Sequence, residues 1–252
     1  MIATIDHGAV RELRLARPPA NALDPELIAA LGASVAAAPS AGARALVLSG
    51  APGIFSGGLD VPYLLTLDRA AIAATWRSFY RLMHLLAASP VPVIAALTGH
   101  SPAGGAVIAI FCDARIMAEG DFKIGLNEVR VGIPMPPVIY QAARRLVGAR
   151  QAERLCVSGA LISPAEAARV GLIDEVAPAE SVVERAVGLA SSLLSLPPAA
   201  MTATRKLARA DLVALFDGGL DQELDDVLEV WFSAETRTTL QGLRDRLAAR
   251  KD

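Results

Sequence analysis

The sequence has little cysteine and almost no net charge, with two cysteines and a formal charge of −2 in 252 residues. Cys112 and Cys156 lie far apart in apolar surroundings, so we expect buried reduced thiols and no disulfide framework. Lysine and arginine are scattered along the chain and form no basic field that could hold a nucleic-acid backbone or an anionic membrane. We therefore expect neither nucleic acid nor a membrane among its partners.

The sequence also lacks an uninterrupted apolar run of membrane-spanning length. The longest apolar stretch, Val91–Phe111, has about the 20 residues that a transmembrane helix needs. Its middle, however, reads Thr-Gly-His-Ser-Pro-Ala-Gly-Gly, which is typical of a turn. The segment 1–6 has no basic region followed by an apolar core, so it does not predict a signal peptide. We expect a cytoplasmic protein.

Short apolar runs alternate with longer segments of helical pattern over the first three quarters of the chain. The predicted strands are Ile2–Ile5 and Val10–Leu15, joined as a hairpin, then Ala43–Ser49, Val93–Leu97, Ala114–Ala118 and a short strand near Leu172–Val176. The predicted helices include one capped by Asp24 that runs to about Ala38, one at Arg69–Ala87 and one at Gly105–Phe111. Beyond Pro197-Pro198 the pattern is helical only, with a hinge at Gly218-Gly219. The pattern predicts an α/β core over residues 1–196 and a helical region over 197–252.

Two of the predicted buried strands each lead into a glycine-rich loop. One loop contains Gly57-Gly58 and the other Gly104-Gly105. Glycines allow a ligand to approach the main chain closely, and unpaired backbone N–H groups at a helix start attract an anionic oxygen. Neither loop has a phosphate-binding or dinucleotide-binding glycine pattern, so nucleotide binding is not supported. Taken alone, the glycines are also compatible with simple tight turns.

The second loop nearly matches the Gly-x-Ser-x-Gly elbow of serine hydrolases, in the segment Gly99–Ala103. Two facts oppose a nucleophilic Ser101. The next residue must donate its N–H to the oxyanion, and Pro102 has none. The general base should follow the serine, yet the three histidines, His7, His84 and His100, all precede it. They are also too dispersed to predict a metal site.

Glu128 interrupts an apolar segment that reads Ile-Gly-Leu-Asn-Glu-Val. A carboxyl group with apolar neighbours has a raised pKa, which suits a general base near neutral pH. The alternative is an ordinary surface glutamate without a catalytic role.

Several motifs, in order and at family spacing, resemble the crotonase superfamily, also called the enoyl-CoA hydratase/isomerase family. They are Ala16–Leu23, Phe55–Asp60, Pro102–Gly105, Cys112–Ile116, Ser158–Ala160 and Ala165–Asp174. The resemblance implies a spiral of ββα units followed by a helical trimerisation region. It implies an acyl-CoA thioester as substrate, no cofactor or metal beyond the coenzyme A of that substrate, and a homotrimer or a dimer of trimers.

The resemblance also implies roles for individual residues. The backbone N–H groups of Leu59 and Gly104 would form the oxyanion hole for the thioester carbonyl, and the segment Pro62–Arg81 would line the pocket for the acyl tail. The residues implied to bind the substrate are Ala20 and Leu23 near the adenine, together with Gly57, Gly58, Asp60, Val61 and Asn127.

One departure from the family pattern bears on the reaction. Family hydratases have a glutamate three residues after the oxyanion glycine and a second glutamate further on. Here the first position holds Val107 and the second holds Glu128, as in Δ3,Δ2-enoyl-CoA isomerases. We therefore expect an isomerase that uses Glu128 as its single acid/base. The alternatives are another reaction of the family, such as hydration, and a non-catalytic CoA-binding member.

Overall fold

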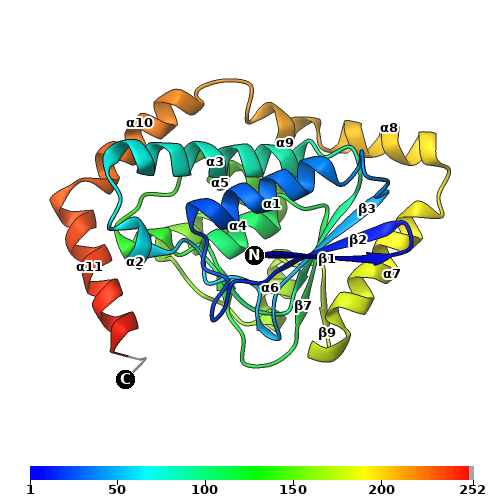
Figure 1. Ribbon diagram of the computed structural model, residues 1–252, viewed down its shortest axis with the longest axis horizontal. Coiled ribbons are helices and arrows are strands. Elements are labelled where there is room, and N and C mark those ends of the chain that lie inside the picture. The colour runs from blue at the N-terminus through cyan, green and yellow to red at the C-terminus, as the bar shows by residue number, and fades with distance from the viewer. Residues whose placement is uncertain (250–252) are drawn as a thin grey trace.

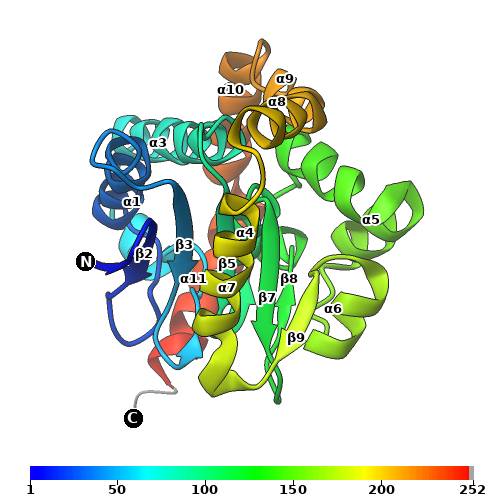
Figure 2. The ribbon, with the colours of Figure 1, turned by 90° about the vertical axis from the view of Figure 1, so that its right-hand side faces the viewer.

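A six-stranded sheet organises residues 1–249, which are the residues that the computed structural model describes. Strands β1 and β2 form the predicted antiparallel hairpin, and the remaining strands follow in parallel in the order β2-β3-β5-β7-β9 (Figures 1 and 2). Their bounds are β1 (Ile2–His7), β2 (Val10–Leu15), β3 (Ala45–Ser49), β5 (Val93–Leu97), β7 (Ala114–Ala118) and β9 (Glu175–Ala177). Every residue of β3 and β5 is buried, as expected for short apolar strands covered on both faces. The α/β prediction is confirmed.

The chain also forms a second, smaller sheet of three short parallel strands. It contains β4 (Gly53–Ile54), β6 (Gly99–Pro102) and β8 (Ile124–Gly125), in the order β4-β6-β8. Each of these strands follows a strand of the large sheet, so that β3, β5 and β7 all continue into the small one. The sequence did not predict these strands, because they are two to four residues long and lie in or beside the glycine loops.

Helices cover both faces of the large sheet. The first seven are α1 (Pro25–Ala37), α2 (Val61–Leu64), α3 (Arg69–Ala87), α4 (Gly104–Ile110), α5 (Pro137–Ser158), α6 (Pro164–Val170) and α7 (Val182–Leu194). Helix α7 packs on β3, β5 and β7 with its own apolar cluster, whereas α1, α3, α4 and α5 share the main core on the other face (Figure 2). The caps agree with the predictions: Asp24 accepts a hydrogen bond from the Leu27 N–H at 2.7 Å, and Pro25 is the first residue of α1.

The chain after residue 197 is helical, as predicted. It forms α8 (Pro198–Ala208), α9 (Ala210–Ala214), α10 (Leu220–Trp231) and α11 (Ala234–Ala248). Helix α10 packs against α3, and α11 lies beside α2 at one end of the molecule (Figure 1). The division into units 1–196 and 197–252 and the trimerisation role stay predictions, and residues 250–252 lie outside the described chain. No single described helix is long and apolar enough to cross a membrane, and the segments Ala179–Leu194 and Pro198–Ala208 reach that length and composition only together, across a bend of 112°.

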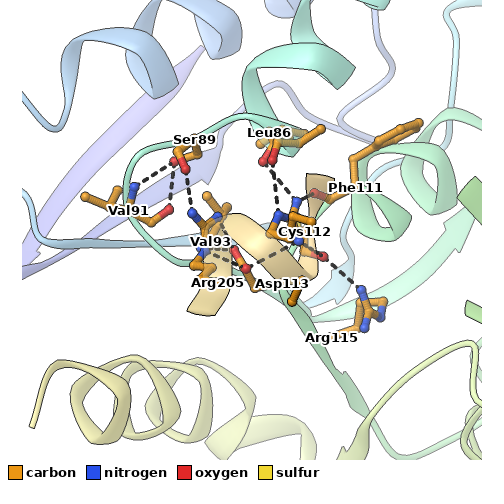
Figure 3. A network of polar contacts seen from close by, with 12 residues as sticks. Leu86, Ser89, Val91, Val93, Phe111, Cys112, Asp113, Arg115 and Arg205 are labelled. Carbon is orange, nitrogen blue, oxygen red and sulfur yellow. Dashed lines mark hydrogen bonds and ion pairs between the residues drawn. The ribbon is translucent and has the colours of Figure 1, made fainter. Parts of the chain in front are cut away.

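A buried polar network attaches these C-terminal helices to the core (Figure 3). Arg205 pairs with the Asp113 carboxylate at 2.7 Å, and the same carboxylate accepts a hydrogen bond from the Val93 N–H at 2.8 Å. Arg209, buried between α8 and α9, donates to backbone carbonyls at the ends of both α3 and α4. Those acceptors are the carbonyl oxygens of Leu86, Ala87, Phe111 and Cys112. Positive charge beside the last carbonyls of a helix is favourable, so Arg209 stabilises both helix ends.

Candidate active site

A cavity of about 350 Å³ lies where the two glycine loops meet the segment that carries Glu128. Its lining residues are Gly57, Leu59, Val61, Trp76, Phe79, Pro102, Ala103, Gly104, Asn127, Glu128, Val131, Ile133, Ile139, Leu161, Leu243 and Leu247. Three of them are the predicted base and the two predicted oxyanion donors, and Gly57, Val61 and Asn127 are also predicted site residues. A larger cavity of about 560 Å³ between α7 and α8 is apolar except for a few polar groups, of which Asp113 and Arg205 pair with each other. The smaller cavity is therefore the candidate active site.

The N–H group of Leu59 is left free by the way in which its neighbours are bonded. Leu59 forms an isolated parallel bridge with Leu23: the Leu23 N–H donates to the Gly58 carbonyl at 2.8 Å, and the Asp60 N–H donates to the Leu23 carbonyl at 3.0 Å. In this pattern the N–H of Leu59 points away from Leu23. Within residues 1–249 it donates no hydrogen bond, so it is available to a ligand in the cavity.

The second donor, the N–H group of Gly104, is the first of helix α4. Hydrogen bonding along the helix begins at Val107, whose N–H donates to the Ala103 carbonyl at 2.9 Å, so the N–H of Gly104 has no partner inside the helix. Ala103 has φ +46° and ψ −123°, an uncommon backbone conformation that costs about 1–3 kcal/mol for a residue with a side chain. Such outliers cluster at functional sites, where the surrounding structure maintains them. This one turns the chain from β6 into α4 beside the cavity.

Gly58 and Gly104 are in close contact across the two loops. Gly58 has φ +83°, which favours glycine, and a Cβ atom on it would lie 3.2 Å from the Gly104 nitrogen. A Cβ atom on Gly104 would lie 2.8 Å from a methyl group of Leu23. The close approach of the two loops therefore depends on glycine at both positions.

Glu128 begins the short 3₁₀ helix η1 (Glu128–Val131). The residue is 7% exposed, and its Oε2 atom has no hydrogen-bond partner among the described residues. Burial raises the pKa of this carboxyl group from 4.5 to about 7, because the charged form loses its hydration. The Oδ1 atom of neighbouring Asn127 is also buried and has no hydrogen-bond partner within residues 1–249. Two polar groups without protein partners thus face an otherwise apolar cavity, as expected of groups that meet a substrate.

The remaining predicted binding residues support the first loop and do not line the cavity. The Ala20 carbonyl accepts a hydrogen bond from the Gly57 N–H at 2.8 Å, and the Leu23 side chain is fully buried. Asp60 caps α2 through the Tyr63 N–H at 3.1 Å and pairs with Arg17. Direct contacts of these residues with a ligand stay predictions.

Val107, at the position of the first glutamate of the family hydratases, lies one turn beyond Gly104 in α4. It is 1% exposed, belongs to the main apolar core and is not among the residues that line the cavity. Glu128 is the only carboxyl group among the lining residues of the described chain.

The apolar wall of the cavity comes from several segments that are distant in sequence. Helix α3 contributes Trp76 and Phe79, which lie in the segment that the sequence analysis assigned to the tail pocket. Helix α11 contributes Leu243 and Leu247, which the sequence analysis missed. Their helical spacing fits any amphipathic helix, so the sequence carries no signal that singles them out.

The serine-hydrolase alternative has no structural support. Ser101 is fully buried and its Oγ atom has no partner in the described chain. His100 accepts a hydrogen bond from the Lys123 N–H and packs edge-on against Phe122, while His7 bonds to Glu12 and His84 stacks on Phe216. Within residues 1–249 no group of three or more His, Cys, Asp or Glu residues is placed to hold a metal ion.

The chain is similar to known proteins over nearly its whole length. A family model described as "Enoyl-CoA hydratase/isomerase" matches residues 6–244. The human protein named "Enoyl-CoA delta isomerase 1, mitochondrial" is 30% identical over 250 residues, which are 98% of this chain and 83% of the human one. A "Probable enoyl-CoA hydratase" of Bacillus subtilis is 30% identical over 243 residues, covering 94% and 93% of the two chains. The crystal structure of human mitochondrial delta3-delta2-enoyl-CoA isomerase matches with a TM-score of 0.94 and 29% identity, over 100% of this chain and 99% of that one.

Proposed function

The chain belongs to the enoyl-CoA hydratase/isomerase family of the crotonase superfamily, and we propose that it is an isomerase that converts a 3-enoyl-CoA into the 2-trans-enoyl-CoA. The observation that carries this proposal is the single carboxyl group, that of Glu128, among the described residues that line the cavity. A double-bond shift needs one group that removes a proton and returns it, whereas water addition in this family uses two acids. The position of the other acid holds the buried Val107.

In the proposed mechanism the thioester oxygen accepts hydrogen bonds from the N–H groups of Leu59 and Gly104. Glu128 removes a proton from C2, and the electron pair moves into a dienolate whose negative charge rests on the thioester oxygen. The protonated Glu128 then returns the proton at C4, and the double bond forms between C2 and C3. The pKa of about 7 suits this exchange, because the group accepts and releases a proton near neutral pH. Atoms and electrons balance within the substrate, so the reaction requires no redox cofactor.

The two backbone donors carry a large share of the proposed catalysis. Charge develops on the thioester oxygen only as the proton leaves C2, so preorganised N–H groups stabilise the transition state more than the bound substrate. Losing one such donor typically lowers kcat by about 10²–10³-fold.

The second candidate is hydration of a 2-enoyl-CoA, which is favoured by the likeness to the probable hydratase of B. subtilis. Purified protein is assayed with 3-enoyl-CoA and 2-enoyl-CoA thioesters of several chain lengths. We expect isomerisation to be at least tenfold faster than hydration. Faster hydration would overturn the isomerase proposal and favour the hydratase.

The role of Glu128 is tested in the same assay with Glu128→Gln, which keeps the size of the side chain and removes the base. We expect a loss of about 10²–10⁴-fold in isomerisation, the usual contribution of a general base. The matched control is Glu153→Gln, at an exposed position of α5, which should be as active as the parent. A Glu128→Gln protein that isomerises as fast as the parent would contradict the mechanism.

We also propose a homotrimer or a dimer of trimers. The mass of the particle in solution, measured by light scattering after size-exclusion chromatography, separates these states from a monomer or dimer.

A further inference from the structure

Arg17 connects the two segments on which the direction of the Leu59 N–H depends. Its Nε atom pairs with Asp24 at 2.9 Å, and its terminal nitrogens reach the Asp60 carboxylate at 2.7 Å and the Ala22 carbonyl at 3.1 Å. The side chains of Arg17, Asp24 and Asp60 are 27%, 11% and 14% exposed, so this ion-pair network is partly shielded from water. A planar guanidinium group with several donors can hold three acceptors in a fixed arrangement, which an ammonium group cannot.

The three acceptors flank the bridge between Leu23 and Leu59. Ala22 and Asp24 lie on either side of Leu23, and Asp60 follows Leu59. The bridge orients the Leu59 N–H away from Leu23, so anything that keeps the two segments in register also keeps this donor directed into the cavity. The guanidinium of Arg17 joins the segments beside the bridge.

The two carboxylates are themselves held in place by their other oxygens. Oδ1 of Asp24 caps α1 through the Leu27 N–H, and Oδ1 of Asp60 caps α2 through the Tyr63 N–H. Helix α2 starts at Val61, a residue that lines the cavity. Arg17 thus binds to two fixed points, one on each side of the bridge.

We propose that Arg17 is a positioning residue, whose guanidinium holds Ala22, Asp24 and Asp60 together and thereby aligns the Leu59 N–H with the thioester oxygen. Arg17 is not among the residues that line the cavity, and in this proposal it acts on the thioester oxygen through Leu59. This inference rests on the oxyanion-hole part of the proposed function. It is independent of whether the product is an isomer or a hydrate, because both reactions place charge on the same oxygen.

The first test is the substitution Arg17→Met, assayed in whichever enoyl-CoA reaction the parent protein catalyses best. A misplacement of about 1 Å can lower a rate roughly 10²-fold, so we expect kcat to fall about 10–100-fold while KM changes less than threefold. Arg17→Lys keeps the charge but cannot reach all three acceptors, and it should recover less than a tenth of the lost kcat. The control is Arg185→Met, which removes an exposed arginine paired with Glu175 and should leave kcat unchanged. Each rate is divided by the concentration of sites that bind an acyl-CoA, so partial unfolding does not count as lost catalysis.

The second test measures the hydrogen bond from the Leu59 N–H to a bound thioester carbonyl and does not require a reaction. Butyryl-CoA labelled with ¹³C at its carbonyl cannot react, and infrared difference spectra report the hydrogen bonds that its bound carbonyl accepts. We expect a lowered stretching frequency in the parent, and a frequency nearer that of free butyryl-CoA in Arg17→Met. Asp60→Asn serves as a second variant where Arg17→Met folds poorly. The asparagine oxygen can still cap α2 but no longer pairs as an anion with Arg17, and we expect a smaller change in the same direction.

An Arg17→Met protein with a kcat within twofold of the parent, or with the parent's carbonyl frequency, would overturn the positioning role. A parent that hydrates and does not isomerise would overturn the proposed isomerase, while these comparisons between parent and variant would still test Arg17. A parent that binds butyryl-CoA without any lowering of the carbonyl frequency would overturn the oxyanion hole together with this inference.

Discussion

The backbone nitrogen of Leu59 lies against Gly104, so that a Cβ atom added to Gly104 would be only 3.4 Å from it. Leu59 follows β4 and Gly104 follows β6, and these two strands are paired in the small sheet. The pairing brings two N–H groups that are 45 positions apart in the sequence to one side of a single cavity. Two donors at one place are what a developing oxyanion requires.

Substitution of Gly104 by alanine should impair catalysis. The added methyl group would lie 2.8 Å from a methyl group of Leu23, so the Leu23 side chain, whose backbone is bridged to Leu59, would have to shift. We expect kcat to fall about 10²-fold, as when one oxyanion donor is lost. Gly188→Ala is the matched control, because Gly188 lies within α7 with no atom within 4 Å of its added Cβ. That change should keep the parent kcat and raise stability by about 0.5–1 kcal/mol. Equal kcat values for the two variants would contradict the assignment of Gly104.

The activity should depend on pH through Glu128. The carboxylate must be ionised to remove the proton, and burial raises its pKa to about 7. We therefore expect kcat/KM to rise tenfold per pH unit well below pH 7 and to level off above it. The measurement is kcat/KM from pH 5 to 9. A rate that is flat down to pH 5 would mean that Glu128 has an ordinary pKa or is not the base.

Glu128→Gln should make the protein more stable at high pH, although it strongly lowers the rate of isomerisation. The folded state raises the pKa of Glu128 from 4.5 to about 7, so the unfolded state ionises first as the pH rises, and stability falls between these values. Removing the carboxyl group should therefore add about 3 kcal/mol to the free energy of unfolding above pH 7 and almost nothing near pH 4. Urea unfolding of parent and variant at both pH values measures this difference. A gain that is the same at pH 4 and pH 8 would show that it does not come from ionisation.

The side chain of Phe79 should limit the length of the acyl group. Its ring lies edge-on to Trp76, with centroids 6.1 Å apart, and both residues line the apolar part of the cavity. Phe79→Leu shortens this wall, and we expect kcat/KM for a longer acyl chain, relative to a four-carbon one, to rise roughly tenfold. Phe122→Leu is the control, since Phe122 packs on His100 outside the cavity and should leave the ratio unchanged. An unchanged ratio in Phe79→Leu would place the end of the acyl chain elsewhere.

Arg209 should matter for stability and not directly for chemistry. Arg209→Met would leave the carbonyls of Leu86, Ala87 and Phe111 without this donor and would remove a buried partner of Asp113, while the Cys112 carbonyl would keep its hydrogen bond from Arg115. We expect a loss of about 3 kcal/mol in the free energy of unfolding. Arg145→Met, which removes an exposed pair with Asp211, should cost less than about 1 kcal/mol. Similar losses in both variants would contradict the special role of Arg209.

The middle of the large sheet could be predicted because β3 and β5 are short, largely apolar and lie close to glycine or proline in the sequence. Val93–Leu97 and Ala114–Ala118 have the predicted bounds, while the strand predicted as Ala43–Ser49 begins at Ala45. The strand predicted near Leu172–Val176 overlaps the observed β9 only in part, because β9 is Glu175–Ala177. The small sheet was missed because two-residue strands such as Gly53–Ile54 have no periodicity, and only their partners in space define them.

The candidate site could be predicted in its chemistry but not in its shape. Glu128 is an acidic residue among apolar neighbours, and adjacent glycines such as Gly57-Gly58 indicate an unusual backbone conformation. Both features can be recognised in the local sequence. Arg17 leaves no such signal, because its role depends on Asp60, which is 43 residues away. The apolar lining leaves none either, since Leu243 has the same character as many core leucines.

The elements that hold the reacting groups differ from the helix that forms the aromatic wall. Glu128 lies on η1, the Leu59 N–H lies in a loop and the Gly104 N–H lies at the start of α4. Trp76 and Phe79, by contrast, project from the middle of α3. Changes on that helix can therefore retune which thioesters are accepted without disturbing proton transfer. Proteins built in this way can change their substrate specificity through substitutions on one face of one helix, while the residues that carry out the reaction stay the same.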